Sequence, residues 1–107
     1  MEIKQYEIVL VNFDPSVGGE TLKTFPCAVI SPDEMNKYLQ TVVIAPLTSC
    51  SRPYPTRVEI NQAKVNGWIV LDQIRTIDRI RIIKKLGMLA ETEIESVKAV
   101  IMETFVE

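Results

Sequence analysis

Residues 40–47 read QTVVIAPL, and the unbroken apolar run at 42–45 predicts a β-strand that is buried on both faces. Two upstream stretches, YEIVLVNF at 6–13 and FPCAVIS at 25–31, are rich in β-branched and aromatic residues and show little helical periodicity. Further strands are predicted downstream, at 56–60 and 68–74, and residues 79–86 form either a last strand or a strand with a short turn. The chain is therefore expected to be mainly β, with short strands that close into a small barrel.

Proline, glycine and polar residues mark the breaks between these strands. The segment 14–24, which begins DPSVGGE, predicts a long loop, and the proline-containing segment 48–55 predicts another. Residues 32–36 predict one helical turn, because a proline and two acids open it. Asn66 and Gly67 predict a tight turn between strands.

The C-terminal segment has helical signals. Thr92 and Glu95 have the spacing of a capping box, in which each side chain satisfies a backbone donor at the start of a helix. One apolar stripe then recurs at helical spacing, formed by Ile94, Val97, Ile101 and Phe105. We expect this helix to pack its stripe on the barrel.

Length and composition restrict the class of protein. A chain of 107 residues with 47% hydrophobic and 24% charged residues is expected to form one globular domain, spanning 1–107. No apolar run approaches the roughly 18 to 20 residues that a membrane span needs, and the first residues carry no signal-peptide core. We therefore expect a cytoplasmic protein with no membrane partner.

The sequence contains few kinds of side chain that could act as a nucleophile or a metal ligand. Histidine is absent, which excludes a Ser–His or Cys–His nucleophile and a histidine metal site. Cys27 and Cys50 lack the spacing of a zinc site, and each lies in an apolar stretch, where a reduced cysteine packs as a small hydrophobe. The sequence therefore predicts no metal and no cofactor, and both cysteines are expected in the core.

Charge is segregated along the chain. Residues 52–85 carry eight Lys and Arg against three acids, a net charge of +5, whereas residues 86–107 have a net charge of −4. This pattern suits an anionic partner that docks on one face, or simply a set of solvated strand edges. Within the basic segment, Tyr54 lies between Arg52 and Arg57, where it either stacks on a base or packs on the barrel.

Three segments carry a more specific signal because of their order and spacing. The first is NFDPSVGGE at 12–20, leading into KTFPCAVIS at 23–31; the second is IAPLTS at 44–49. The third is VLDQIRTID at 70–78, followed by KLG at 85–87. Together they closely resemble the MazF/PemK family of toxin endoribonucleases, from about Tyr6 to the C-terminal helix.

The resemblance implies a fold and an activity. The fold is an SH3-like barrel with a C-terminal helix, in a symmetric homodimer. The activity is cleavage of single-stranded RNA without a metal, leaving a cyclic phosphate or 3′-phosphate and a free 5′-hydroxyl, and the inhibitor is a cognate acidic antitoxin. Other proteins with this fold poison DNA gyrase and cut nothing, so a non-enzymatic binding protein is the alternative.

Such cleavage uses the ribose 2′-hydroxyl as nucleophile, and it needs a base, donors to the phosphorane and an acid. By the resemblance, Thr48 is a donor; otherwise it only ends a strand. Asp72 matches an acidic position that serves as base in some members, or it caps a turn or pairs with Arg75. Glu20 matches a glutamate implicated in some members, or it is a solvated loop charge. The resemblance also suggests substrate contacts from Gly19, Lys23, Thr24, Ser49 and Arg75; Arg75 alternatively pairs with Asp72 or Asp78.

One position departs from the family pattern. The family reads Lys-Thr-Arg-Pro where this chain has Lys23-Thr24-Phe25-Pro26, and the arginine is its principal catalytic cation. A second arginine of some members is Val70 here. The sequence leaves three explanations for Phe25: an engineered inactivation, a degenerate toxin that still binds RNA or antitoxin, or another cation that substitutes. The cations available for this last role are Lys23, Arg52, Arg57 and Arg75.

Overall fold

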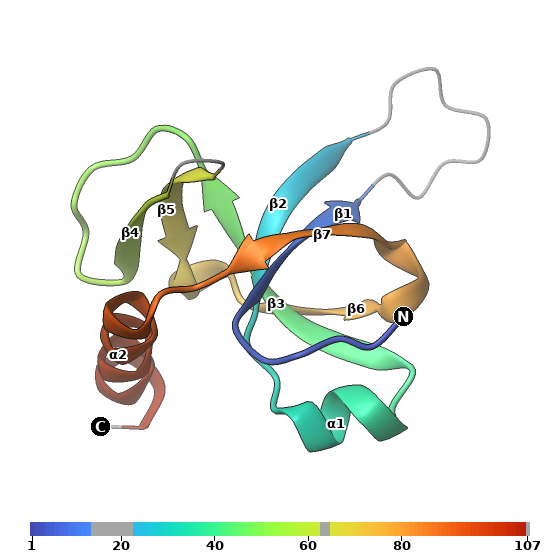
Figure 1. The fold of residues 1–107 in the computed structure, drawn as a ribbon. Coiled ribbons are helices and arrows are strands. Elements are labelled where there is room, and N and C mark those ends of the chain that lie inside the picture. The colour runs from blue at the N-terminus through green and yellow to red at the C-terminus, as the bar shows by residue number, and fades with distance from the viewer. Residues whose placement is uncertain (14–22, 63–64, 107) are drawn as a thin grey trace.

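Seven antiparallel strands form one strongly curled sheet in the computed structural model, which describes residues 1–13, 23–62 and 65–106 (Figure 1). The path of paired strands runs β4-β5-β3-β2-β1-β7, and β6 pairs with β3 beside it. The strands are β1 (Glu7–Asn12), β2 (Thr24–Val29), β3 (Thr41–Thr48), β4 (Arg57–Asn61), β5 (Asn66–Val70), β6 (Arg75–Asp78) and β7 (Ile82–Met88). The predicted small, mainly β barrel is confirmed.

Strand β3 organises the sheet. On one edge it pairs with β2, whereas on the other edge its first half pairs with β6 and its end pairs with β5. The chain steps from β5 to β6 through a 3₁₀ turn, Leu71–Gln73, whose Leu71 is fully buried. The continuous strand predicted at 68–74 is therefore wrong, because this turn moves the chain along β3 from one pairing region to the other.

Both faces of the central strands are buried. Because side chains alternate along a strand, Ala45 and Leu47 of β3 join a core cluster that includes Val97 of the C-terminal helix. Val42 and Ile44 point to the opposite side, into a second cluster inside the curl of the sheet. The prediction of a strand buried on both faces is confirmed.

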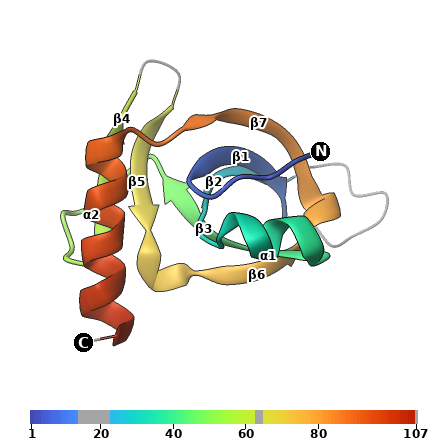
Figure 2. The same ribbon diagram turned by 60° about the horizontal axis from the view of Figure 1, so that its bottom comes forward.

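Two helices pack on this sheet (Figure 2). The short α1 (Asp33–Tyr38) lies near the predicted helical turn. Its Asn36 is fully buried and accepts a hydrogen bond of 2.5 Å from the Ser31 hydroxyl. The Asn36 amide also donates to the Ser31 carbonyl at 2.9 Å. Helix α2 (Glu91–Ile101) packs near β4 and contributes the buried Val97.

The start and the end of α2 differ from the prediction. The helix begins at Glu91, and Glu93 rather than Glu95 accepts from the backbone N–H of Ala90, at 2.8 Å. Beyond Ile101 the chain continues into a wider, π-type turn, Met102–Val106. A wider turn rotates later side chains away from the helical stripe. For this reason Phe105, expected in the core, is 57% exposed.

Two other expectations are also corrected, and one alternative is decided. Asn66 and Gly67 lie within β5 rather than in a tight turn, and they pair with the end of β4. Of the two alternatives for 79–86, the strand with a short turn is confirmed, since a 3₁₀ turn at Arg79–Arg81 precedes β7. Cys27 is buried as expected, but Cys50 is exposed because it follows the end of β3. In the described part of the chain, no helix has the length and apolar character to cross a membrane.

Candidate functional site

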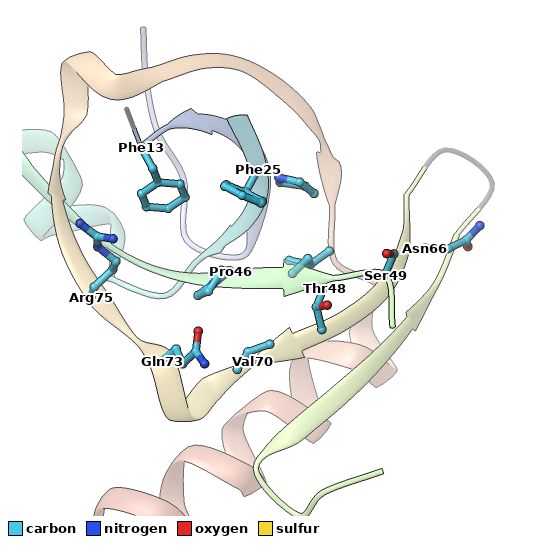
Figure 3. A pocket seen from close by; sticks show the side chains of 11 residues that line it. Phe13, Phe25, Pro46, Thr48, Ser49, Asn66, Val70, Gln73 and Arg75 are labelled. Atoms are coloured by element: carbon cyan, nitrogen blue, oxygen red, sulfur yellow. The ribbon is translucent and has the colours of Figure 1, made fainter. Parts of the chain in front are cut away.

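An open pocket of about 590 Å³ lies where β2, β3 and the β5–β6 turn meet (Figure 3). The described apolar residues that line it are Phe13, Phe25, Pro26, Pro46, Leu47 and Val70. Its described polar lining consists of Thr48, Ser49, Asn66, Gln73 and Arg75. Pairing within the sheet brings these positions together, since β3 lies between β2 and β5.

Two aromatic rings form one wall of the pocket. Phe25 belongs to β2 and is 45% exposed, although phenylalanine usually buries its ring. Phe13 follows β1, and its ring centroid lies 5.7 Å from that of Phe25, with the planes tilted by 52°. Phe25 therefore occupies the wall of the pocket at the place where the resemblance expects an arginine.

Arg75 is the charged side chain of the described pocket lining. Its guanidinium carbon lies 4.7 Å from the centroid of the Phe13 ring, a cation–π contact that holds the side chain against the wall. The described part of the chain contains no ion pair from Arg75 to Asp72 or to Asp78, the two acids that the sequence offered. Arg75 thus faces the same pocket as Phe25 (Figure 3).

Thr48 ends β3 at the other side of the pocket, next to Ser49 (Figure 3). Its hydroxyl donates to the carbonyl of Cys50 at 3.1 Å and accepts from the N–H of Cys50 at 3.4 Å. These bonds fix the hydroxyl at the mouth of the pocket. To donate to a phosphate, the Thr48 hydroxyl has to leave the Cys50 carbonyl.

Asp72 is not among the residues that line the pocket. Its Oδ1 accepts a hydrogen bond of 2.8 Å from Thr56 and lies 3.6 Å from Nε of Arg57. Desolvation raises the pKa of Asp72, but the hydrogen bond from Thr56 and the charge of Arg57 outweigh it and hold the pKa below its usual range. The ion partner of Asp72 is therefore Arg57, not the Arg75 considered from the sequence.

Arg57 connects Asp72 to the loop that follows β3. It donates to the Ser51 hydroxyl at 2.7 Å, and its guanidinium carbon lies 4.9 Å from the centroid of the Tyr54 ring. Tyr54 is 47% exposed, so its ring is not packed into the core. Arg57 covers one face of the ring. This set of contacts holds the loop between β3 and β4.

The remaining predicted site residues are dispersed. Gly19 and Glu20 lie outside the described residues. Lys23 is exposed and accepts from the N–H of Phe13 through its carbonyl at 2.9 Å, while Thr24 pairs with Asn12; neither is among the residues that line the pocket. Sequence reasoning missed Phe13 and Gln73, although both lie inside the quoted motifs NFDPSVGGE and VLDQIRTID.

Comparison with known proteins gives this site a context. Residues 4–105 match the family model of PemK-like, MazF-like toxins of type II toxin–antitoxin systems. A relative from Staphylococcus epidermidis, the endoribonuclease MazF, is 34% identical over 97 residues, which cover 85% of this chain and 81% of that protein.

Solved structures show the same fold. MazF from Deinococcus radiodurans (Form-I) superposes with a TM-score of 0.80 at 25% identity, covering 96% of both chains. A mycobacterial endoribonuclease in complex with its cognate antitoxin gives a TM-score of 0.81 at 17% identity, covering 94% of this chain and 92% of the other. The chain belongs to the PemK-like, MazF-like toxins of type II toxin–antitoxin systems.

Proposed function

We propose that this toxin is an endoribonuclease that cleaves single-stranded mRNA in the pocket described above. The observation that carries the proposal is the presence of Arg75 and Thr48, a cation and a hydroxyl, on the lining of one open pocket beside two aromatic rings. The relative from Staphylococcus epidermidis, which carries the name endoribonuclease MazF, supports the same class of reaction.

The proposed reaction begins at the ribose 2′-hydroxyl. Its oxygen attacks the adjacent phosphorus, the bond to the 5′-oxygen breaks, and the products are a 2′,3′-cyclic phosphate and a free 5′-hydroxyl. Negative charge builds on the phosphorane oxygens, and donors fixed around them lower the barrier. Arg75 suits this part because a guanidinium presents several donors to phosphate oxygens. The hydroxyl of Thr48 would donate a further hydrogen bond.

The base has to be a carboxylate or another non-histidine group. A general base works best when its pKa lies near the ambient pH. The pKa of Asp72 is lowered and its Oδ1 accepts from Thr56, so Asp72 is a weak base. We assign it a positioning role instead: its carboxylate holds the guanidinium of Arg57 in place. Glu20 is then the carboxylate to test as base.

Partners follow from the family. An acidic antitoxin is the proposed inhibitor, and the mycobacterial structure that contains a cognate antitoxin supports an antitoxin partner. A homodimer is the proposed assembly, from the family resemblance alone. Because the proposed substrate is mRNA, the proposed place of action is the cytoplasm.

The experiment is incubation of the purified protein with a mixed-sequence single-stranded RNA in EDTA, followed by mapping of the ends. We expect discrete cuts with 5′-hydroxyl ends. Arg75→Gln and Thr48→Val should each slow cleavage, by about 10²-fold for the loss of one hydrogen-bond donor to the phosphorane. Arg79→Gln is the matched control, since Arg79 does not line this pocket. Equal cleavage rates for Arg75→Gln and Arg79→Gln would contradict the assignment.

A second function is favoured by one observation. Phe25 carries no charge at the position where the resemblance expects the principal catalytic cation, so a toxin that binds without cutting is the alternative. Binding of the same RNA with no new ends after long incubation would establish this alternative and overturn the endoribonuclease proposal.

A further inference from the structure

We infer that the rings of Phe25 and Phe13 form a stacking platform for an unpaired base of a single-stranded RNA. This inference rests on the proposed function only in its choice of RNA as ligand. It assigns Phe25 a role of its own in substrate recognition, in addition to the absence of the family's catalytic arginine at this position.

The exposure of Phe25 is the first step of the argument. Its ring is 45% exposed on the wall of a pocket, and the neighbouring Phe13 ring, 5.7 Å away, extends the apolar surface. An exposed aromatic wall of this kind offers a flat ligand a π-face on which to stack. The two rings therefore favour an occupant that is itself flat and aromatic.

The rest of the lining restricts the occupant further. Thr48 and Gln73 offer hydrogen-bonding groups across the pocket from the rings, for the polar edges of a base, and Arg75 supplies a positive charge at one end (Figure 3). The guanidinium of Arg75 lies over the Phe13 ring, 4.7 Å from its centroid, so the base is expected to stack on the exposed Phe25 ring with this cation on the same pocket lining. A phosphate joined to the stacked base would thus be close to a cation. An RNA nucleotide combines these three features: a flat face, polar edges and an anionic phosphate.

The size of the pocket agrees with this occupant. Its volume of about 590 Å³ falls within the range of small-ligand sites, which runs from about 300 to 1,000 Å³. Thr48, which would donate to the scissile phosphate, lines the same pocket as Phe25. Stacking would therefore hold the chain of the RNA beside the reacting groups.

The test measures binding of a short single-stranded oligonucleotide in which every ribose is 2′-O-methylated, so that cleavage is blocked. A matched set of oligonucleotides has the same sequence, and in each one a single base is removed at a different position along the chain. The proteins are the wild type, Phe25→Leu, Phe25→Tyr and Phe105→Leu. The last is the control, because Phe105 is an exposed phenylalanine that does not line the pocket. Circular dichroism and thermal unfolding check that each variant is folded.

We expect Phe25→Leu to weaken binding by about 5- to 150-fold, the range for losing one stacked base. Phe25→Tyr should bind like the wild type, because it keeps the π-face. One abasic position should weaken binding to the wild type but have little further effect on Phe25→Leu. The dependence of affinity on salt should be the same for both proteins, since no phosphate contact is removed.

Several results would overturn the platform. Phe25→Leu could bind as tightly as Phe105→Leu, or every abasic oligonucleotide could bind as tightly as the intact one. A Phe25→Leu variant that binds RNA normally but binds an acidic peptide more weakly would assign the rings to the antitoxin instead. A parallel assay uses the same oligonucleotides with free 2′-hydroxyls. Cleavage of these that is unaffected by Phe25→Leu and by abasic positions would contradict the platform and leave the proposed nuclease intact. Binding that depends on Phe25, with no cleavage of the unmethylated oligonucleotides, would support the platform and contradict the nuclease.

Discussion

The carboxylate of Asp72 accepts a hydrogen bond of 2.8 Å from the hydroxyl of Thr56. A backbone bond of 3.1 Å, from the N–H of Leu71 to the carbonyl of Thr56, runs beside it. The turn after β5 is thus joined to the residue that precedes β4. Since Arg57 adds an ion pair to the same carboxylate, the ionised form of Asp72 is the one that these contacts stabilise.

The first prediction is a pH dependence of stability at Asp72. Its pKa is lowered in the folded protein, so the stabilisation it contributes is complete above the ordinary aspartate pKa and is lost as pH falls through the folded pKa. Asp72→Asn should therefore lower the free energy of unfolding at pH 7 by less than about 1 kcal/mol, because the side chain is partly exposed. Urea unfolding from pH 7 down to about 2 should show this difference shrink in the acid range. A difference that is constant throughout would contradict the ion-pair account.

A second prediction concerns Gly67. Its φ is +150°, and a Cβ there would lie 2.6 Å from the carbonyl oxygen of Thr48. Gly67→Ala should cost about 2 to 3 kcal/mol of unfolding free energy and slow cleavage, because β3 has to shift at Thr48. Gly87→Ala is the control, since the nearest atom to its added Cβ is a side-chain oxygen of Gln62 at 3.8 Å. Similar free energies of unfolding for the two variants would show that the Thr48 carbonyl does not restrict the residue type at position 67.

The third prediction tests the buried Asn36. Its side chain both accepts from and donates to Ser31, and the Ser31 hydroxyl accepts from the N–H of Val43 at 3.0 Å. Asn36→Ala leaves the Ser31 carbonyl without its side-chain donor and should cost about 2 to 3 kcal/mol. Tyr38→Ala, on the same helix but 76% exposed, should change stability by less than about 0.5 kcal/mol. Equal losses in thermal or urea unfolding would argue against a structural role for this pair.

The fourth prediction restores the missing cation. Phe25→Arg should raise the rate of RNA cleavage by about 10²- to 10³-fold, since it adds a charged donor to the wall of the pocket that Thr48 also lines. Because the same change removes the proposed stacking face, kcat is expected to rise while the abasic penalty on binding disappears. Phe105→Arg adds the same charge outside the pocket and should leave the rate unchanged. An unchanged rate for Phe25→Arg would show that the absence of a cation at this position does not limit the rate of cleavage.

Local patterns in the sequence predicted much of the architecture. The apolar run in β3 predicted burial on both faces, and the core clusters on its two sides confirm it. The stripe of α2 predicted the buried Val97. The ordered motifs also named Thr48, Ser49, Phe25 and Arg75, and the structure places all of them on one pocket.

The wrong predictions share a cause: each concerns a residue whose structure depends on a neighbouring strand or on the exact path of the chain. Asn66 and Gly67 have the residue types of a tight turn, but Gly67 is required because the carbonyl of Thr48 lies too close for a Cβ. Arg75 and Asp72 are three residues apart in sequence, yet the 3₁₀ turn that contains Asp72 directs its carboxylate to Arg57, whereas Arg75, after the turn, reaches the Phe13 ring.

Sequence patterns are thus sufficient to predict the family, the strands that form the centre of the sheet, and the residue types available for chemistry. The folded chain was needed to show that Phe13 contacts Phe25, that Arg75 faces the pocket, and that Asp72 accepts from Thr56. The difference is one of distance along the chain. Apolar periodicity acts between residues close in sequence, whereas contacts within a pocket depend on strand register and on turns that bring distant residues together.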